Sequence, residues 1–457
     1  MRHIVYFSAL VATIIAPPVS AIQVANFPVT KDLAESYGCG EDCQKVLNKT
    51  LAIDISTVGR DFDVDFYSTA ANFTHSKAGD LLKLTPLDPN SLDDRAGTTV
   101  YRMQYSSKDL DGSTVPATGF IAFPYTASFK QRGGDTRHHD KYRVVAVAHG
   151  TIGTQYGCAP SNGPGLFDYD TWKPLLERGY AVVATDYAGL GNNYTSHKYL
   201  SFRAQASDLY YSVVAARQAF GGSLTKDWMS IGYSYGGGAA WKLAESQYVK
   251  HDENYLGTVA VGPVMSLDMV LDKNAKRDML SHLPLVAPAI KAAIPSYKEN
   301  MLSDKIRKRM ELANKAQVCA LSVLGLSLDL ALEDIYSKEG LEKDKPVLLQ
   351  WVKDNSPAQG DKSPAPILLI QGLNDTTAPL EVTERAWRNA CASGSEVHLS
   401  LYSGMDHSPA ASAGGPEFMS WIDDQFLKAK GGKSNCTRVT REPFDAKYVK
   451  APPEVSW

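Results

Sequence analysis

The amino-acid sequence predicts an α/β layered fold with a mostly parallel central sheet. Short continuous apolar runs rich in β-branched residues are typical of strands buried on both faces of a parallel sheet. These runs lie at residues 144–148, 180–184, 229–231, 258–261, 366–370 and 397–402. Segments with helical periodicity lie between several of them, at 204–219 and 239–248. Two further strands, 99–106 and 114–124, precede this region and flank an Asp-Gly turn signal.

The alternation of strands and helices breaks between residues 266 and 345, which predicts an insertion. This stretch has helical periodicity, three prolines and many apolar residues. We expect a helical cap that shapes an acyl-binding site, with a plain extra helical layer as the alternative. The predicted organisation is a signal peptide (1–21), an N-terminal segment packing on the core (22–95), an α/β core (96–265 and 346–430), the cap (266–345) and a C-terminal tail (431–457).

The composition is that of an ordinary globular protein. Of the 457 residues, 44% are apolar and 21% are charged, and the formal net charge is -3. Charges of both signs are interspersed, without a basic block or an acidic tail. We therefore expect no binding to nucleic acid or to an anionic membrane surface.

The first residues predict secretion. A short positive segment, Met1-Arg2-His3, precedes the apolar residues 4–16, and Val19-Ser20-Ala21 is a small-residue cleavage site. An apolar helix of this length extends only about 20 Å, which is too short to span a bilayer. We expect cleavage near Ile22 and an extracellular mature protein, with an uncleaved anchor as the alternative.

Secretion makes disulfides and glycans expected features. The six cysteines allow fifteen pairings and spacing alone selects none, although Cys39 and Cys43 are close enough to pair locally. No cysteine or histidine spacing typical of a zinc site occurs, so we expect no metal. N-glycosylation is predicted at the sequons of Asn48, Asn72, Asn193 and Asn435. A fifth sequon, at Asn374, lies beside a predicted catalytic residue and is left out of this set.

The most specific motif is Gly-Tyr-Ser-Tyr-Gly at residues 232–236, a G-x-S-x-G sequence. Such a turn holds a serine at a strained corner between a strand and a helix, with glycines where a Cβ would clash. Residues 227–231 are predicted as the entering strand, and the small residues 237–240 open a helix. This context is typical of the α/β-hydrolase fold, and it predicts Ser234 as the nucleophile.

A serine hydroxyl needs a base and an orienting acid, which follow it in this fold in the order acid, then histidine. Asp375 comes just after the strand 366–370 and is the predicted acid. His407 follows the last predicted strand and is the predicted base. Asp406 is the second choice for the acid, because neighbours on a chain rarely face each other well.

Backbone N–H groups must stabilise the oxyanion of the tetrahedral intermediate. One donor is expected from Tyr235, the residue after the nucleophile. The other is expected from the loop after the strand 144–148, and Thr151 is the predicted donor, with Gly150 permitting close approach. We expect His149 in the same loop to form structural hydrogen bonds.

These residues resemble the fungal secretory lipases of the lipase A type, over most of the mature chain. The resemblance rests on Cys-Ala-Pro-Ser at 158–161, on residues 178–189, on Gly-Tyr-Ser at 232–234, and on the spacing of serine, aspartate and histidine. It implies an α/β-hydrolase fold with a helical cap, ester hydrolysis, and bridges Cys158–Cys319 and Cys391–Cys436. Cys39 is then left to pair with Cys43. The chain departs from the family in lacking an acidic residue in its first oxyanion loop, and in having Tyr235 rather than glycine after the nucleophile.

The predicted function is secreted carboxylic ester hydrolysis, as a lipase or esterase, through a Ser-His-Asp triad and an acyl-enzyme. The alternative is an acetylesterase acting on a fungal secondary metabolite such as a trichothecene, because some relatives of this family have that activity. A serine peptidase of the same fold is a further alternative, which comparison of ester and aminoacyl-amide substrates would separate. We expect a monomer without a cofactor, a small-molecule or lipid ester as substrate, and only transient contact with a lipid interface.

Overall fold

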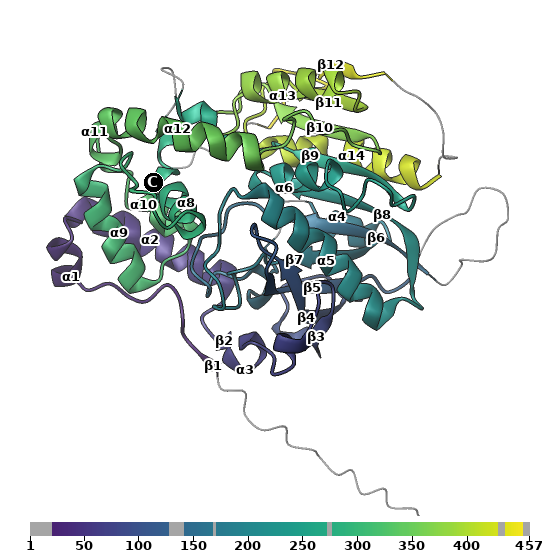
Figure 1. Cartoon of the computed structure of the whole chain (residues 1–457), viewed down its shortest axis with the longest axis horizontal. Coiled ribbons are helices and arrows are strands. Elements are labelled where there is room, and N and C mark those ends of the chain that lie inside the picture. Colours follow the sequence, from purple (N-terminus) through teal and green to yellow (C-terminus); the bar gives the residue numbers. More distant parts are fainter. Residues whose placement is uncertain (1–20, 128–140, 168–170, 272–276, 428–434, 451–457) are drawn as a thin grey trace, which may run out of the picture.

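The strands predicted from the apolar runs form one sheet through the centre of the molecule (Figure 1). The computed structural model describes residues 21–127, 141–167, 171–271, 277–427 and 435–450. Within them the central sheet has ten strands in the order β12-β11-β10-β9-β8-β6-β7-β5-β4-β3. Their bounds are β3 (Leu81–Pro86), β4 (Thr99–Lys108), β5 (Thr114–Phe123), β6 (Tyr142–Ala148), β7 (Ala181–Thr185), β8 (Leu224–Tyr233), β9 (Tyr255–Val261), β10 (Ile367–Gly372), β11 (Val397–Tyr402) and β12 (Thr437–Arg441).

Strands β6 to β12 run parallel, and β3, β4 and β5 add an antiparallel edge. The prediction of a mostly parallel sheet is therefore confirmed. Two strands of this sheet, β3 and β12, were not expected from the sequence. A separate two-stranded sheet pairs β1 (Ala21–Ile22) with β2 (Phe62–Asp63). The predicted signal peptide (1–21) lies outside the described residues except for Ala21, its last residue, which is in β1.

The helices form three groups along the chain. The N-terminal group is α1 (Lys31–Ser36), α2 (Glu41–Val58), α3 (Val64–Tyr67) and the short 3-10 turns η1 (Phe73–His75) and η2 (Pro89–Ser91). Those within the sheet domain are η4 (Pro160–Asn162), α4 (Lys173–Glu177), α5 (Phe202–Phe220), α6 (Tyr235–Ala244), α13 (Leu380–Ala392) and α14 (Pro409–Leu427). The insertion contains η5 (Leu267–Leu271), α7 (Arg277–Leu280), α8 (Leu283–Ala293), α9 (Asp304–Ala316), α10 (Ala320–Gly325), α11 (Leu332–Ile335) and α12 (Lys338–Asn355).

Helices cover both faces of the parallel strands, and neighbouring residues of a strand therefore enter different cores. In β6, Val144 and Ala146 are buried in the core shared with α5, α6 and the insertion. Val145 and Val147 are buried in the opposite core, which includes side chains of α4 and α14. Burial on both faces explains why these strands appear in the sequence as continuous apolar runs.

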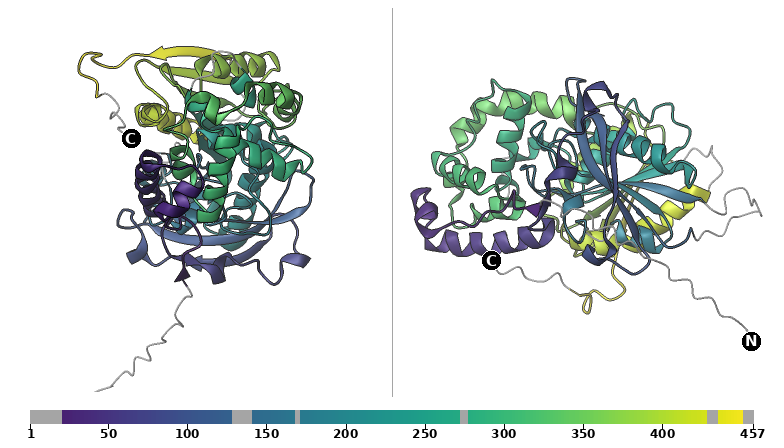
Figure 2. Two further views of the ribbon diagram at one scale, coloured as in Figure 1. Left: turned by 90° about the vertical axis from the view of Figure 1, so that its left-hand side faces the viewer. Right: turned by 90° about the horizontal axis from the view of Figure 1, so that it is seen from below.

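The insertion forms a cap beside the sheet, and the N-terminal helices α1 and α2 lie with it rather than on the sheet (Figures 1 and 2). Asp54 of α2 accepts the backbone N–H groups of Leu321 and Ser322 at the start of α10, at 3.3 and 2.9 Å. Helix N-termini have unpaired N–H groups, so this carboxylate caps α10 from another helix. Burial raises the pKa of Asp54 to about 6.

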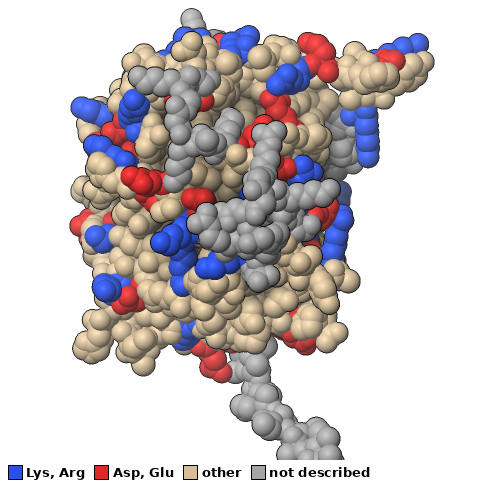
Figure 3. Space-filling model, turned by 90° about the vertical axis from the view of Figure 1, so that its right-hand side faces the viewer, with Lys and Arg blue, Asp and Glu red and all other residues tan. Residues whose placement is uncertain are grey.

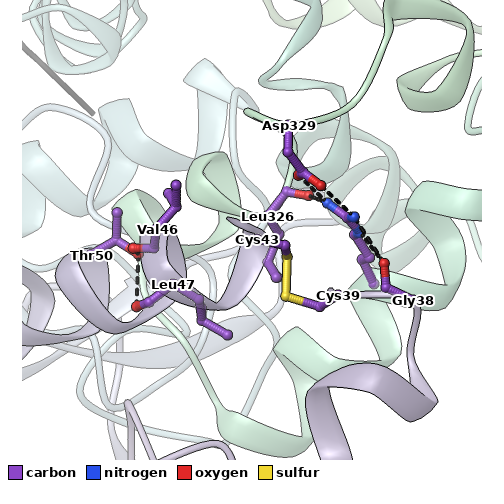
Figure 4. Close-up of a disulfide and its surroundings, with 9 residues drawn as sticks. Gly38, Cys39, Cys43, Val46, Leu47, Thr50, Leu326 and Asp329 are labelled. Atoms are coloured by element: carbon purple, nitrogen blue, oxygen red, sulfur yellow. Dashed lines mark hydrogen bonds and ion pairs between the residues drawn. A yellow bond between two sulfur atoms is a disulfide. The ribbon is translucent and has the colours of Figure 1, made fainter. Parts of the chain in front are cut away.

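A buried arginine makes a second connection between the N-terminal segment and the cap. Arg309 of α9 donates to the backbone oxygen of Gly38 at 2.8 and 3.1 Å, and forms an ion pair with Asp329. Figure 4 shows Gly38 and Asp329 near the bridge between Cys39 and Cys43. The predicted N-terminal segment is thus divided, since α1 and α2 lie with the cap, whereas β3 joins the sheet and Lys83 of β3 bonds to the backbone of α3. The last cap helix, α12, also continues past residue 345, the predicted end of the insertion, and contains Pro346.

The structure pairs the cysteines as Cys39–Cys43, Cys158–Cys319 and Cys391–Cys436. The first bridge closes a local loop at the start of α2 (Figure 4). The second joins the loop after β6 to the start of α10, and so ties the cap to the sheet. The third fixes the residue before β12 to α13. These are the pairings that the family resemblance implies.

Removal of the Cys158–Cys319 bridge is expected to lower stability more than removal of Cys39–Cys43. In the chain-entropy model a bridge across 161 residues contributes about 5 kcal/mol, and one across 4 residues contributes about 2 kcal/mol. We expect the Cys158→Ala, Cys319→Ala variant to show the larger decrease in Tm by calorimetry, and Cys39→Ala, Cys43→Ala to serve as the matched control. Equal decreases in Tm would contradict this account of the long bridge.

The charged side chains on the face shown in Figure 3 are interspersed, with Lys and Arg next to Asp and Glu among the described residues. No helix among the described residues is both long enough and apolar enough to cross a membrane. The four predicted glycosylation residues, Asn48, Asn72, Asn193 and Asn435, are all exposed, so a glycan on any of them has access to solvent. Glycosylation itself stays a prediction.

Candidate active site

Ser234 lies in the sharp turn between β8 and α6, at the carboxyl end of a central strand. Its backbone is left-handed, with φ 56° and ψ -122°, which is strained for a residue other than glycine. A Cβ on Gly232 would lie 2.0 Å from the Gly236 oxygen, and one on Gly236 would lie 2.0 Å from the Ala148 oxygen. Only glycine fits at either position, which is the physical reason for the G-x-S-x-G sequence.

The loops after β10 and β11 bring Asp375 and His407 to the same edge of the sheet. His407 Nε2 lies 2.8 Å from Ser234 Oγ, and His407 Nδ1 lies 2.8 Å from Asp375 Oδ2. The structure therefore brings together all three residues predicted as the triad. A Cβ on Gly262, after β9, would come within 3.2 Å of the His407 ring, so this glycine leaves room for the imidazole.

Three further donors hold the Asp375 carboxylate, which is buried. Thr377 N–H and Ala378 N–H donate to Oδ1 at 2.9 and 2.7 Å, and the Gln371 amide donates to Oδ2 at 2.9 Å. Gln371 was not selected from the sequence. The available signal was a polar residue at the end of the apolar strand 366–370, and by itself that is a weak signal.

Asp406, the second choice for the acid, has a different role. Its Oδ1 accepts the backbone N–H groups of His407 and Thr376, at 2.7 and 3.2 Å. These bonds close the turn that carries His407. The imidazole bonds to Asp375 instead.

The loop predicted to supply an oxyanion donor packs against the turn that carries the nucleophile. A Cβ on Gly236 would lie 2.5 Å from the His149 oxygen, and one on Gly150 would lie 3.2 Å from the Tyr233 ring. Thr151 follows directly, half-buried, and its hydroxyl lies 2.6 Å from the Tyr199 hydroxyl. Tyr235 is the first residue of α6, so its N–H is among those without an intrahelical partner.

Two buried histidines belong to this region, His149 in the loop itself and His197 between β7 and α5. The His149 ring is within hydrogen-bonding distance of the backbone oxygens of Gly150 and Asp186, at 2.7 and 3.1 Å, which is consistent with the structural role expected for it. His197 Nδ1 lies 3.1 Å from the Ala188 oxygen, and its Nε2 lies 3.4 Å from the Tyr235 hydroxyl. Burial lowers the pKa of His149 to about 4 and that of His197 to about 3, so both rings are neutral at pH 7.

Solved structures with the same fold are known. The chain is similar to Candida antarctica lipase A, with a TM-score of 0.64 and 16% identity, covering 82% of this chain and 88% of that one. It is also similar to the rice cell wall degrading esterase LipA from Xanthomonas oryzae, with a TM-score of 0.56 and 19% identity, covering 77% and 98%. These similarities show the α/β-hydrolase fold, as predicted.

The fold and the family comparison together show a serine hydrolase that acts on carboxylic esters. The model of the family described as secretory lipase matches residues 167–433, which is more than half of the chain. The chain belongs to the secretory lipase family, which confirms the resemblance inferred from the sequence. Membership also makes it an extracellular protein.

Sequence relatives of the chain include lipases. Lipase 10 from Candida albicans is 23% identical over 396 residues, covering 82% of this chain and 83% of the relative. A secreted triacylglycerol lipase from Malassezia globosa is 24% identical over 226 residues, covering 47% and 49%. These relatives agree with the lipase or esterase activity of the family.

Proposed function

We propose that this enzyme hydrolyses carboxylic esters through a covalent acyl-enzyme on Ser234, with His407 as general base and Asp375 as the orienting acid. The observation that carries the proposal is the continuous contact from Ser234 Oγ through the His407 ring to the Asp375 carboxylate. The described residues contain no group of His, Cys, Asp or Glu side chains that could hold a metal ion.

The contacts of His407 determine which ring nitrogen accepts the serine proton. Asp375 Oδ2 accepts the Nδ1–H bond, so the Nε2 lone pair faces the Ser234 hydroxyl. As Ser234 Oγ attacks the ester carbonyl carbon, its proton passes to Nε2. The Asp375 carboxylate stabilises the imidazolium that forms.

The carbonyl oxygen becomes an oxyanion in this step and needs hydrogen-bond donors that are already in place. We assign the backbone N–H of Tyr235, at the N-terminus of α6, as one donor. We assign the N–H of Thr151, in the loop packed against the nucleophile turn, as the other. Each such donor lowers the barrier by about 3 kcal/mol.

Collapse of the intermediate completes acylation. The C–O bond to the alcohol breaks, and His407 Nε2–H gives its proton to the departing oxygen. A water then takes the place of the alcohol, loses a proton to His407 Nε2 and attacks the acyl carbon. The bond from the acyl carbon to Ser234 Oγ breaks as His407 Nε2–H returns the proton to Oγ, which releases the carboxylic acid and regenerates the serine.

We further propose lipid esters as the substrate class. The support is membership of the secretory lipase family and relatives named as triacylglycerol lipases. The cap agrees with this assignment, because its helix α8 carries a run of apolar side chains and packs on α9 and α10. A metabolite acetylesterase is the alternative carried from the sequence.

Alkylphosphonate p-nitrophenyl esters test two assignments together: Ser234 as the nucleophile, and the preference of the enzyme for a long acyl chain over a short one. Ser234 Oγ attacks phosphorus and displaces p-nitrophenolate, which leaves a stable adduct. We expect mass spectrometry to find this adduct on the peptide containing Ser234, with Ser408 unmodified. We also expect a dodecylphosphonate to inactivate the enzyme at least 10-fold faster than a methylphosphonate. Labelling of a residue other than Ser234 would refute the assignment of the nucleophile. Faster inactivation by the methylphosphonate would favour the acetylesterase alternative.

A further inference from the structure

The side chain of Thr151 has a buried tyrosine as its partner. Thr151 Oγ lies 2.6 Å from the hydroxyl of Tyr199, a residue that is only 3% exposed. The loop that carries Thr151 packs against the residues on both sides of Ser234, as the close approaches at Gly150 and Gly236 show. The loop that carries the threonine hydroxyl therefore lies against the turn that holds Ser234, the residue proposed to attack the substrate carbonyl.

Either hydroxyl of this pair could be the donor, so the direction of the bond is assigned from the surroundings. Tyr199 is buried, whereas Thr151 is only half-buried. A buried O–H that lacks an acceptor is costly, and Thr151 Oγ is the acceptor that the structure provides. We therefore assign Tyr199 as the donor, which leaves Thr151 to direct its own proton elsewhere.

Tyr199 is held in place by its neighbours. Its ring centroid lies 4.8 Å from that of Tyr235, the residue that follows the nucleophile. The next residue, Leu200, has a left-handed backbone with φ 59°, and its carbonyl accepts a bond from Trp351 of the cap helix α12 at 3.2 Å. Packing on both sides therefore fixes the position of the Tyr199 hydroxyl.

We infer that the Thr151 hydroxyl is a third donor to the oxyanion, beside the two backbone N–H groups, and that Tyr199 is the positioning residue that orients it. This inference rests on the proposed function, because it requires attack by Ser234. As the carbonyl π electrons move onto oxygen, the Thr151 O–H proton is shared with the new oxyanion and no proton is transferred. The bond donated by Tyr199 strengthens this O–H as a donor, because linked hydrogen bonds polarise one another.

Thr151→Val removes the hydroxyl and keeps the shape of the side chain, and Thr151→Ser keeps the donor. With p-nitrophenyl butyrate, we expect Thr151→Val to lower kcat roughly 10- to 100-fold and to change KM by less than about threefold. We expect Thr151→Ser to stay within about threefold of the wild type. The inhibition constant of a trifluoromethyl ketone, which mimics the tetrahedral intermediate, should rise by the same factor as kcat/KM falls.

Tyr199→Phe tests the positioning role. Alone it should lower kcat roughly 3- to 10-fold, and in the Thr151→Val background it should lower kcat no further, because its effect passes through the hydroxyl already removed. Thr151→Val alone leaves the buried Tyr199 hydroxyl without its partner, which could destabilise the fold. The double variant removes both hydroxyls of this bond, and so it can be measured if the single variant is unstable.

Three results would overturn the inference: wild-type kcat in Thr151→Val, a Thr151→Ser variant as slow as Thr151→Val, or additive losses in the double variant. Phosphonate labelling distinguishes failure of the third-donor inference from failure of the proposed function. If wild-type Ser234 is labelled and Thr151→Val turns over normally, only the third donor is refuted. If wild-type Ser234 is not labelled, the proposed nucleophile is refuted.

Discussion

Ser234→Ala should lower kcat for p-nitrophenyl butyrate by about 10⁵- to 10⁶-fold. The reason is that the Ser234 hydroxyl is the oxygen nucleophile held 2.8 Å from His407 Nε2, at the left-handed turn after β8. Such a loss corresponds to about 7–8 kcal/mol of barrier. The measurement is steady-state hydrolysis by enzyme whose Tm is unchanged, so that loss of folding is excluded.

Ser408 provides a matched control for Ser234→Ala. Its hydroxyl lies at the same edge of the sheet, next to His407 in the chain, and bonds to the Tyr233 hydroxyl at 2.9 Å. We expect Ser408→Ala to keep activity within about threefold. A Ser234→Ala variant that retained more than about a hundredth of wild-type activity would exclude the acyl-enzyme on this residue.

Asp375→Asn should lower kcat by about 10⁴-fold, because it changes which nitrogen of His407 carries the proton. Thr377 N–H and Ala378 N–H both donate at the Oδ1 position, so the oxygen of the introduced amide must face them. The amide NH₂ then points at His407 Nδ1 and donates to it. The ring proton moves to Nε2, where the base must be unprotonated to accept the serine proton.

Asp406→Asn is the control for the acid. One amide oxygen can still accept both backbone N–H groups that Asp406 Oδ1 accepts in the structure. We expect kcat within about fivefold of the wild type. If Asp406→Asn lost as much activity as Asp375→Asn, or if Asp375→Asn remained active, the roles of the two carboxylates would have to be exchanged.

The parts of the fold that could be predicted are those in which local sequence and burial agree. Residues 144–148 are apolar without alternation because successive side chains enter two different cores. The serine motif could be found because Gly232 and Gly236 are required by contacts within the same turn or with the adjacent strand. The order of serine, aspartate and histidine then located the other two candidates.

The parts that could not be predicted depend on distant partners. Strand β12 consists mostly of exposed polar residues, and its position is set by pairing with β11 and by Cys436 rather than by apolar pattern. Pro288 and Pro346 lie inside helices α8 and α12, although proline usually ends a helix. Tyr199 had no distinguishing sequence signal, since its relation to Thr151 exists only after folding.

The place of α2 in the cap also bears on how the chain folds as it is synthesised. The helix buries Cys43, Leu47 and Leu51, and it packs on α10, which lies roughly 260 residues further along the chain. At a translation rate of about 5–20 residues per second, α10 is made roughly 13–50 s after α2. During that interval the apolar stripe of α2 has no final partner, so the nascent polypeptide must be shielded from aggregation until the cap helices emerge.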